Sequence, residues 1–172
     1  ITYDDDYAAD KAAANTEKLL GVDRVVCIFG IMGTGIGAAM APVAMKYDSF
    51  IFGGLTGAAV LRGPTVPIYH VRESYADEVR RMMAHLTTIG VTRIAIVSSD
   101  DAYGKGIEKD AVDALQKNSL PAVLTLRFDP KDKDQSRAAQ QIIGSGAQAV
   151  YVIAAGMPAI NIIRALAIVP GH

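Results

Sequence analysis

The chain has 172 residues, of which 51% are hydrophobic and 20% are charged, as in an ordinary globular protein. Its formal net charge of −1 provides no basic field for nucleic acid or anionic lipid, so neither is expected as a partner. No apolar run approaches the ~20 residues of a membrane span, and the single cysteine, Cys27, excludes a disulfide within one chain. An oxidising compartment stays open, because a domain with a good core needs no disulfide.

Short apolar runs rich in Val, Ile and Phe recur along the chain, mostly without alternation of polar and apolar residues. Runs of this kind are typical of buried parallel strands. The predicted strands are residues 24–29, 49–52, 68–72, 93–98, 122–128 and 149–154. Cys27 falls inside the first of them, where we expect it to be a small core residue.

The segments between these strands carry apolar residues at helical spacing. The predicted helices are residues 8–20, 75–89, 107–115 and 136–143, and small residues that can open another helix follow the glycine-rich stretch 30–37. Strands that alternate with helices predict right-handed βαβ units and parallel sheets flanked by helices. The expected fold class is therefore α/β.

A change in composition near residues 71–74 divides the chain. Before it the turns are glycine-rich and weakly charged, and after it the helices are longer and more charged. We therefore expect two sequential lobes, residues 1–73 and 74–172. The chain starts without Met and ends on Pro170-Gly171-His172 just after a helix pattern, so both ends look cut. We expect an incomplete, interior piece of a longer protein, and a missing signal peptide then says nothing about location.

The glycine-rich stretch 30–39 directly follows the first apolar run. Such a turn exposes backbone N–H groups at the carboxyl end of a strand, and the dipole of the following helix suits an anion. Gly33-x-Gly35-x-x-Ala38 fits a relaxed dinucleotide fingerprint, which also needs an acidic residue at the end of the next strand. That strand ends in Phe52-Gly53-Gly54 without an acid, and we expect Pro42 to interrupt the helix early. A dinucleotide is therefore not predicted.

Residues suited to catalysis or metal binding do not form a recognisable set. The sequence has no Gly-x-Ser-x-Gly nucleophile motif and no Walker loop. His70, His85 and His172 lack the spacing of metal ligands, and we expect His70 to be structural and His85 to be solvated. The acidic runs 4–6 and 100–101 are expected to cap helices rather than to hold a cation. The sequence therefore predicts no catalytic residue, no metal and no cofactor.

Small and hydroxylic residues instead follow four of the predicted strands. They are residues 33–37, 54–58, 101–104 and 154–157. Ligands of open α/β sheets bind at the carboxyl ends of the strands. Four such ends from two lobes would face one cleft, with N–H groups and hydroxyls but no nucleophile–base pair. This set of hydrogen-bonding groups indicates a site that binds a small polar acid without catalysing a reaction on it.

At this point the sequence resembles the periplasmic solute-binding proteins of the leucine/isoleucine/valine-binding type, which have the type I fold and feed ABC importers. The resemblance is collinear over nearly all of the chain. The matching segments are Tyr3-Asp4-Asp5, residues 12–20, 26–34, Thr56-Gly57-Ala58, Leu61-Arg62, 71–75, Asp77-Glu78, 94–104, 134–136 and 147–156. The family implies two Rossmann-like lobes joined by three crossings, of which this chain should hold the first.

The resemblance also implies which residues contact the ligand. In this family the first glycine-rich turn grips a carboxylate, the second turn contacts the ligand, and a tyrosine of the other lobe closes over it. The expected ligand-binding residues are Thr34, Gly35, Ile36, Gly37, Leu55, Thr56, Tyr103, Ala155 and Gly156, and the expected hinge residues are Val71, Arg72 and Ser74. The family's usual serine falls at Gly37, so the side-chain part of the carboxylate grip is missing here.

The function that this resemblance implies is capture of a small amino acid or related carboxylate, aromatic or aliphatic, and its delivery to the membrane permease of an ABC importer. The location would be the periplasm, or the cell exterior for a secreted or lipid-anchored form. Gly37 and Ala155 favour a roomier site, which would suit an aromatic acid. The alternative is a ligand-sensing regulatory domain of the same fold, and a third hypothesis is an enzyme with a Rossmann-like site.

Overall fold

The computed structural model describes residues 1–168. Its chain divides into two compact units, one of residues Ile1–Tyr75 and one that begins at Ala76. Each unit contains its own three-stranded parallel sheet, one ordered β1-β2-β3 and the other β5-β4-β6. The α/β class with parallel sheets flanked by helices is therefore confirmed. The assignment of residues 1–73 and 74–172 to two ligand-binding lobes stays a prediction.

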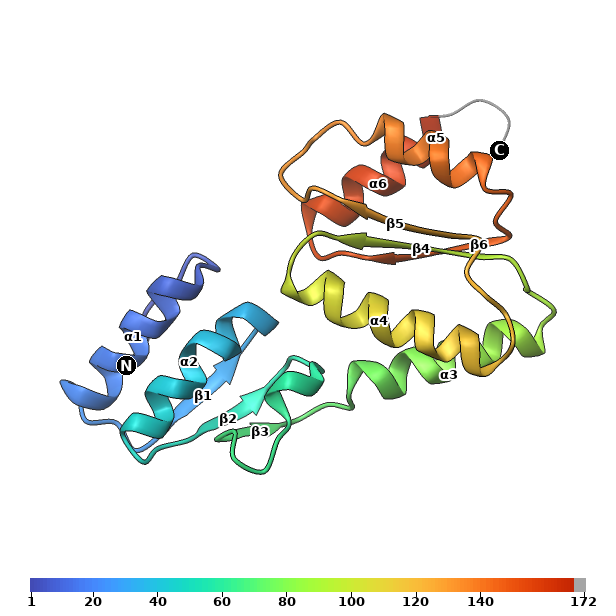
Figure 1. The fold of residues 1–172 in the computed structure, drawn as a ribbon. Coiled ribbons are helices and arrows are strands. Elements are labelled where there is room, and N and C mark those ends of the chain that lie inside the picture. Colours follow the sequence, from blue (N-terminus) through green and yellow to red (C-terminus); the bar gives the residue numbers. More distant parts are fainter. Residues whose placement is uncertain (169–172) are drawn as a thin grey trace. The chain divides into compact units, whose positions relative to one another are not determined.

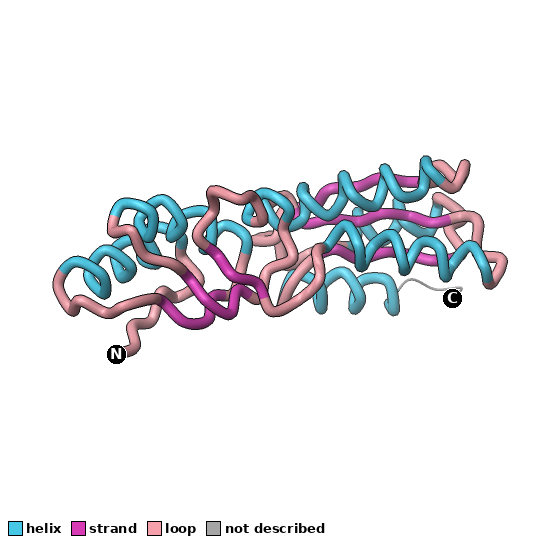
Figure 2. Tube along the Cα trace, turned by 90° about the horizontal axis from the view of Figure 1, so that it is seen from below, coloured by secondary structure: helices cyan, strands magenta, loops and turns pink. Residues whose placement is uncertain are grey.

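The first unit packs two helices against one face of its sheet (Figure 1). Its elements are α1 (Ala9–Gly21), β1 (Ile28–Ile31), α2 (Thr34–Lys46), β2 (Ile51–Gly54), the short 3₁₀ helix η1 (Ala59–Leu61) and β3 (Ile68–His70). Figure 2 shows its three short strands in magenta beside one another. The buried residues Ala12, Thr16 and Leu20 recur every fourth position along α1, which gives the helix one apolar face toward the core.

The opposite face of the first sheet carries a row of aromatic rings. Phe29 is in register with Phe52, and Phe52 is in register with Tyr69. The rings of Phe29 and Phe52 stack with centroids 6.0 Å apart, although Phe29 is 77% exposed and Tyr69 is 60% exposed. Alternate residues of these strands point to opposite faces, so Ile28, Ile51 and Ile68 enter the core.

In the second unit, helices cover both faces of the sheet (Figure 1). Its elements are α3 (Tyr75–Thr88), β4 (Ile94–Ser99), α4 (Ala102–Lys117), β5 (Leu124–Phe128), α5 (Ser136–Gly144), β6 (Ala149–Ile153) and α6 (Met157–Ile168). The central strand β4 is buried at all six positions, with α4 packed against it. On the other face, Ile142 of α5 and Ile162 of α6 join one apolar cluster with Val97 and Phe128.

The first strand begins at Ile28, four residues later than predicted. Val25 and Val26 suggested a longer strand, but Val26 is 84% exposed. Strand pairing starts with Ile28 opposite Ile51, because the Val25 N–H donates to Leu19 O and Val26 O accepts from the Ser49 hydroxyl instead of from a strand. Cys27 therefore lies before the strand and is only partly buried, which makes its prediction as a core strand residue wrong.

Pro42 does not interrupt α2, contrary to the prediction. The helix runs on to Lys46 with Pro42 inside it. A proline in a helix leaves the carbonyl four residues earlier without its usual partner. Here Pro42 and Ala38 are both exposed, so water can hydrogen-bond that carbonyl. The other differences concern boundaries: β3 ends at His70 rather than at residue 72, and α4 begins at Ala102 rather than at residue 107.

Candidate ligand-binding site

The N-terminus of α2 presents backbone N–H groups at the carboxyl end of β1. Thr34, Gly35 and Ile36 form the first turn, where backbone N–H groups have no partner within the helix. Gly33 precedes them with φ of 105°, a left-handed conformation that favours glycine, and it provides no capping side chain. The first turn contains no acidic residue. Three N–H groups and the helix dipole thus favour an anion at this end.

Two threonine hydroxyls lie beside this helix end. Thr34 Oγ1 and Thr56 Oγ1 are 3.2 Å apart, and the residues are 5% and 1% exposed. Thr56 Oγ1 also accepts a hydrogen bond from the backbone N–H of Ala58 at 3.2 Å. The two hydroxyls carry two hydrogens, and the contact between them uses one. In the described part of the chain, the contacts of the pair therefore leave one O–H to donate elsewhere.

The remaining predicted ligand-binding residues of the first unit differ in how exposed they are and in what they pack against. Gly35 is exposed, and a Cβ added there would meet no atom within 4 Å. Gly37 is buried, its N–H donates to Gly33 O at 3.1 Å, and an added Cβ would lie 2.7 Å from Leu61 Cδ1. Because the helix already uses the Gly37 N–H, that group is not among the free donors of the first turn, and a contact between Gly37 and the ligand stays a prediction. Leu55 is exposed, whereas the Ile36 side chain is buried in the core.

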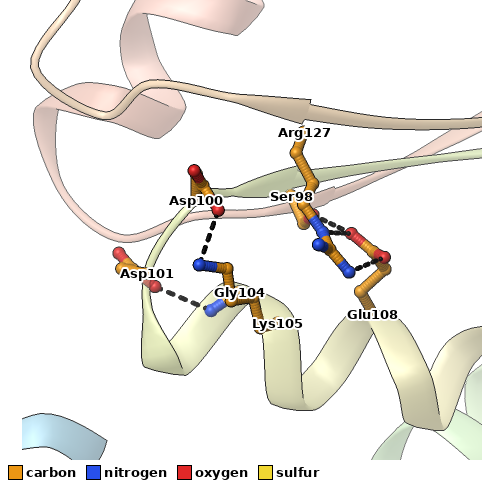
Figure 3. Close-up of polar contacts among 7 residues, drawn as sticks. All are labelled: Ser98, Asp100, Asp101, Gly104, Lys105, Glu108 and Arg127. Carbon is orange, nitrogen blue, oxygen red and sulfur yellow. Dashed lines mark hydrogen bonds and ion pairs between the residues drawn. The ribbon is translucent and has the colours of Figure 1, made fainter.

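The second unit places Tyr103 in the first turn of α4, not in a loop. Asp101 caps this helix, because its Oδ1 accepts from Gly104 N at 2.8 Å (Figure 3). An added Cβ at Gly104 would lie 2.0 Å from the carbonyl oxygen of Ser99, so only glycine permits this approach of α4 to β4. Together, the cap and the glycine fix where α4 begins and hence where Tyr103 lies.

Ala155 and Gly156 follow β6 and are exposed. Strands β4 and β6 are parallel neighbours, with Ser98 opposite Ile153. Their carboxyl ends therefore lie at the same edge of the sheet, which brings Tyr103 to the same edge as Ala155 and Gly156. Gly156 has φ of 63°, and its carbonyl accepts from Ile160 N in the first turn of α6.

The family comparison decides what kind of protein carries these features. The family model described as "Periplasmic binding protein" matches residues 1–169. The chain belongs to the periplasmic binding protein family. No curated protein matches it in sequence at a significant level.

Several solved periplasmic binding proteins have the same fold. A substrate-binding periplasmic protein from Ralstonia solanacearum is 25% identical with a TM-score of 0.84, over 94% of this chain and 46% of that one. A possible leucine/isoleucine/valine-binding protein from Rhodopirellula baltica is 25% identical with a TM-score of 0.83, over 95% and 46%. An ABC-transporter solute-binding protein from R. palustris, solved with 4-hydroxybenzoate, is 18% identical with a TM-score of 0.83, over 92% and 44%.

This chain spans a little under half the length of those solved binding proteins. The type I fold that the sequence resembles is confirmed, whereas the branched-chain amino acid subtype stays a prediction. None of the described helices is both long and apolar enough to cross a membrane.

The predicted hinge residues of this binding protein lie between β3 and α3. Val71 N donates to Gly54 O at 3.3 Å, which continues the pairing with β2 for one residue beyond β3. The Arg72 guanidinium lies over the Tyr75 ring, 4.9 Å from its centroid, and its Nη1 is 3.4 Å from Leu55 O. Val71, Arg72 and Ser74 thus directly precede the boundary between the two compact units. Their hinge role stays a prediction.

Asp100 has a structural partner, and His85 faces solvent. Asp100 pairs with Lys105 Nζ at 2.8 Å (Figure 3), and this contact holds the Asp100 pKa below its usual value. His85 is exposed on α3, and His172 lies outside the described residues. Within residues 1–168, no cluster of three or more His, Cys, Asp or Glu side chains is placed to hold a metal ion.

An ion pair between the half-exposed Arg127 of β5 and the buried Glu108 of α4 lies beyond the first turn of that helix. The Arg127 guanidinium donates to both oxygens of Glu108, at 2.9 and 2.7 Å, and Ser98 Oγ donates to the same carboxylate (Figure 3). The guanidinium and, to a lesser degree, Ser98 hold the Glu108 pKa below its ordinary value against the opposing effect of burial. This network joins α4 to β4 and β5. It therefore helps to hold in place the helix that carries Tyr103.

Sequence reasoning missed one contributor to the site. Arg62 entered the sequence analysis only as part of the family resemblance, yet its Nη2 lies among backbone carbonyls of Thr56, Arg72 and Glu73. The sequence signal was an arginine in the weakly charged first half of the chain, directly before Gly63-Pro64. His70, expected to be structural, contacts Thr56 O at 3.0 Å through Nδ1.

Proposed function

We propose that this protein binds a small carboxylic acid and that the N-terminus of α2 holds the carboxylate. The proposal rests on one observation: three N–H groups at residues 34–36 lie beside a pair of threonines that has one O–H left to donate. N–H and O–H groups only donate to a carboxylate, and charge-assisted hydrogen bonds are the stronger kind. Because these groups donate hydrogen bonds without reacting, we propose that the protein binds the acid without chemical turnover.

The ligand class that we propose is an amino acid or an aromatic acid. The absence of an acidic residue in the first turn of α2 supports a ligand with an anionic end there. The exposed, uncrowded Gly35 leaves room beside the N–H groups for more than a carboxylate. A 4-hydroxybenzoate complex of a relative with the same fold supports an aromatic acid as one candidate. Tyr103, Ala155 and Gly156 remain the proposed contacts from the second unit.

In the cell, we propose that the protein serves as the extracytoplasmic solute-binding component of an ABC importer and presents its ligand to the membrane permease. Family membership supports this role and a periplasmic location, or a secreted or lipid-anchored one. Ligand uptake by cells that lack the gene separates this role from ligand sensing. An importer component predicts loss of uptake, whereas a sensory domain predicts normal uptake with a lost response.

Calorimetry tests the proposed carboxylate site directly. The protein in its full natural length is titrated with L-leucine, benzoate and 4-hydroxybenzoate, and each acid is matched with its primary amide, which lacks the carboxylate charge. Loss of one charged hydrogen bond costs roughly 1.5–3 kcal/mol, so we expect at least one acid to bind about 10- to 100-fold more tightly than its amide. Equal binding of an acid and its amide would contradict a carboxylate held by these donors.

A further inference from the structure

One arginine side chain joins the turn after β2 to the segment that leaves the first unit. Arg62 Nη2 lies 2.7 Å from Arg72 O and 3.0 Å from Glu73 O, both in the segment 71–74 that leads toward the second unit. The same nitrogen lies 3.5 Å from Thr56 O, in the proposed ligand-binding turn. All three carbonyls thus face one nitrogen, and its two hydrogens can serve carbonyls from both segments.

Three more contacts connect residues 56–61 with the residues that flank the segment 71–74. His70 Nε2 lies 2.8 Å from Leu61 O, while its Nδ1 lies 3.0 Å from Thr56 O. The backbone N–H of Tyr75 donates to Gly57 O at 2.8 Å. A Cβ added at Gly57 would lie 2.7 Å from Tyr75 N, so the turn and the segment touch at the backbone. A shift of the turn after Thr56 therefore disturbs the carbonyl positions that Arg62 holds.

We propose that Arg62 is a positioning residue that couples the ligand-binding turn at Thr56 to the connecting segment 71–74. The ligand part of this proposal rests on the proposed function above. When a ligand restricts the motion of the Thr56 turn, the guanidinium also restricts the motion of the backbone at Arg72 and Glu73. Arg62 itself needs no contact with the ligand. The same contacts also act in the ligand-free protein, which gives the proposal a test that does not depend on a ligand.

Hydrogen–deuterium exchange of the full-length protein measures this coupling. Three backbone amides report on it: Ala58 N bonds to Thr56 Oγ1, Val71 N to Gly54 O, and Tyr75 N to Gly57 O. The variants are Arg62→Met, which removes the donors, and Arg62→Lys, which keeps the charge. Arg81→Met, on an exposed position of α3, is the matched control.

Without ligand, we expect Arg62→Met to accelerate exchange about 10-fold in both the turn 54–58 and the segment 70–75, since a lost charge-assisted hydrogen bond has an effect of this order. Arg62→Lys should restore part of the protection, and Arg81→Met should change neither segment. Acceleration in only one segment, or in neither, would overturn the coupling.

With saturating L-leucine or benzoate, wild-type protein should gain protection in both segments. In Arg62→Met, the ligand should still protect residues 34–36 and 54–58 but no longer residues 70–75, an effect that a general loss of stability would not produce. Ligand protection of 70–75 that survives in Arg62→Met would refute the proposal. If neither probe protects wild-type protein although Arg62→Met loosens both segments together, the coupling stands and the proposed function fails instead.

Discussion

Thr34 and Thr56 lie 22 residues apart in the chain, yet their hydroxyl oxygens are 3.2 Å apart in the first unit. They meet because each follows one of two neighbouring parallel strands, and such strands end at the same edge of a sheet. Since Thr56 Oγ1 already accepts from Ala58 N, one hydroxyl hydrogen remains beside the N-terminus of α2. The predictions for the first unit follow from this arrangement.

Thr56→Val should weaken binding of the carboxylate about 10- to 100-fold, because it removes the hydroxyl that completes the donor set. The matched control is Thr16→Val, which removes an equally buried hydroxyl that bonds Ala12 O within α1. Calorimetry should show unchanged affinity for the control. Equal losses in the two variants would mean that Thr56 acts only through stability.

Gly35→Ala and Gly37→Ala should have opposite consequences. The methyl group at residue 35 enters open space at the helix end, so the fold should gain up to about 1 kcal/mol while carboxylate affinity falls. At residue 37 the methyl group meets Leu61 and Ile31, and we expect a net loss of about 1–3 kcal/mol from overpacking. Urea unfolding together with calorimetry checks both. A destabilised Gly35→Ala with normal affinity would contradict the placement of the site.

Gly104→Ala should destabilise the second unit, since the new methyl group would lie 2.0 Å from the backbone oxygen of Ser99. Backbone cannot move aside as a side chain can, so we expect a loss of about 3 kcal/mol or more. Gly106→Ala is the matched control on the same helix, with no atom within 4 Å of the added methyl group. Thermal unfolding should show a lower Tm for the first variant and an equal or higher Tm for the second.

Stability of the second unit should depend on pH through Glu108. Because Arg127 holds the folded-state pKa of Glu108 below its ordinary value of 4.5, the ionised pair stabilises the fold above that value. This stabilisation should be lost as the pH falls through the lowered pKa of the folded protein. Glu108→Gln should unfold more easily in urea at pH 7, and its stability should fall less steeply toward acid than that of the wild type. Parallel pH profiles for the two proteins would argue against this role.

The sequence was sufficient for the order and type of the strands and α-helices, because short apolar runs and helical spacing differ clearly in period, but it did not predict the 3₁₀ helix η1. It was less reliable at β1, where Val25 and Val26 match a strand but their backbone groups bond to Leu19 and to the Ser49 hydroxyl instead of to β2. Pairing between strands is a long-range property that local pattern does not contain.

Within the candidate site, the sequence placed Thr34 and Thr56 at strand ends but could not show that their hydroxyls meet. It also could not separate Gly35 from Gly37. One faces open space and the other packs against Leu61, a distinction that depends on how α2 lies on the sheet. Arg62 escaped notice because its partners are backbone carbonyls, which leave no signature in the side chains of a sequence.

The most direct test of the carboxylate site is a titration of ¹⁵N-labelled, full-length protein with the acid that binds in calorimetry, followed by NMR at the backbone amides. If the N-terminus of α2 holds the carboxylate, the amide protons of Thr34, Gly35 and Ile36 should move downfield in a saturable manner. The Gly37 amide, which already donates to Gly33 O, should move much less. Saturable binding that leaves the amides of residues 34–36 unshifted would contradict the account.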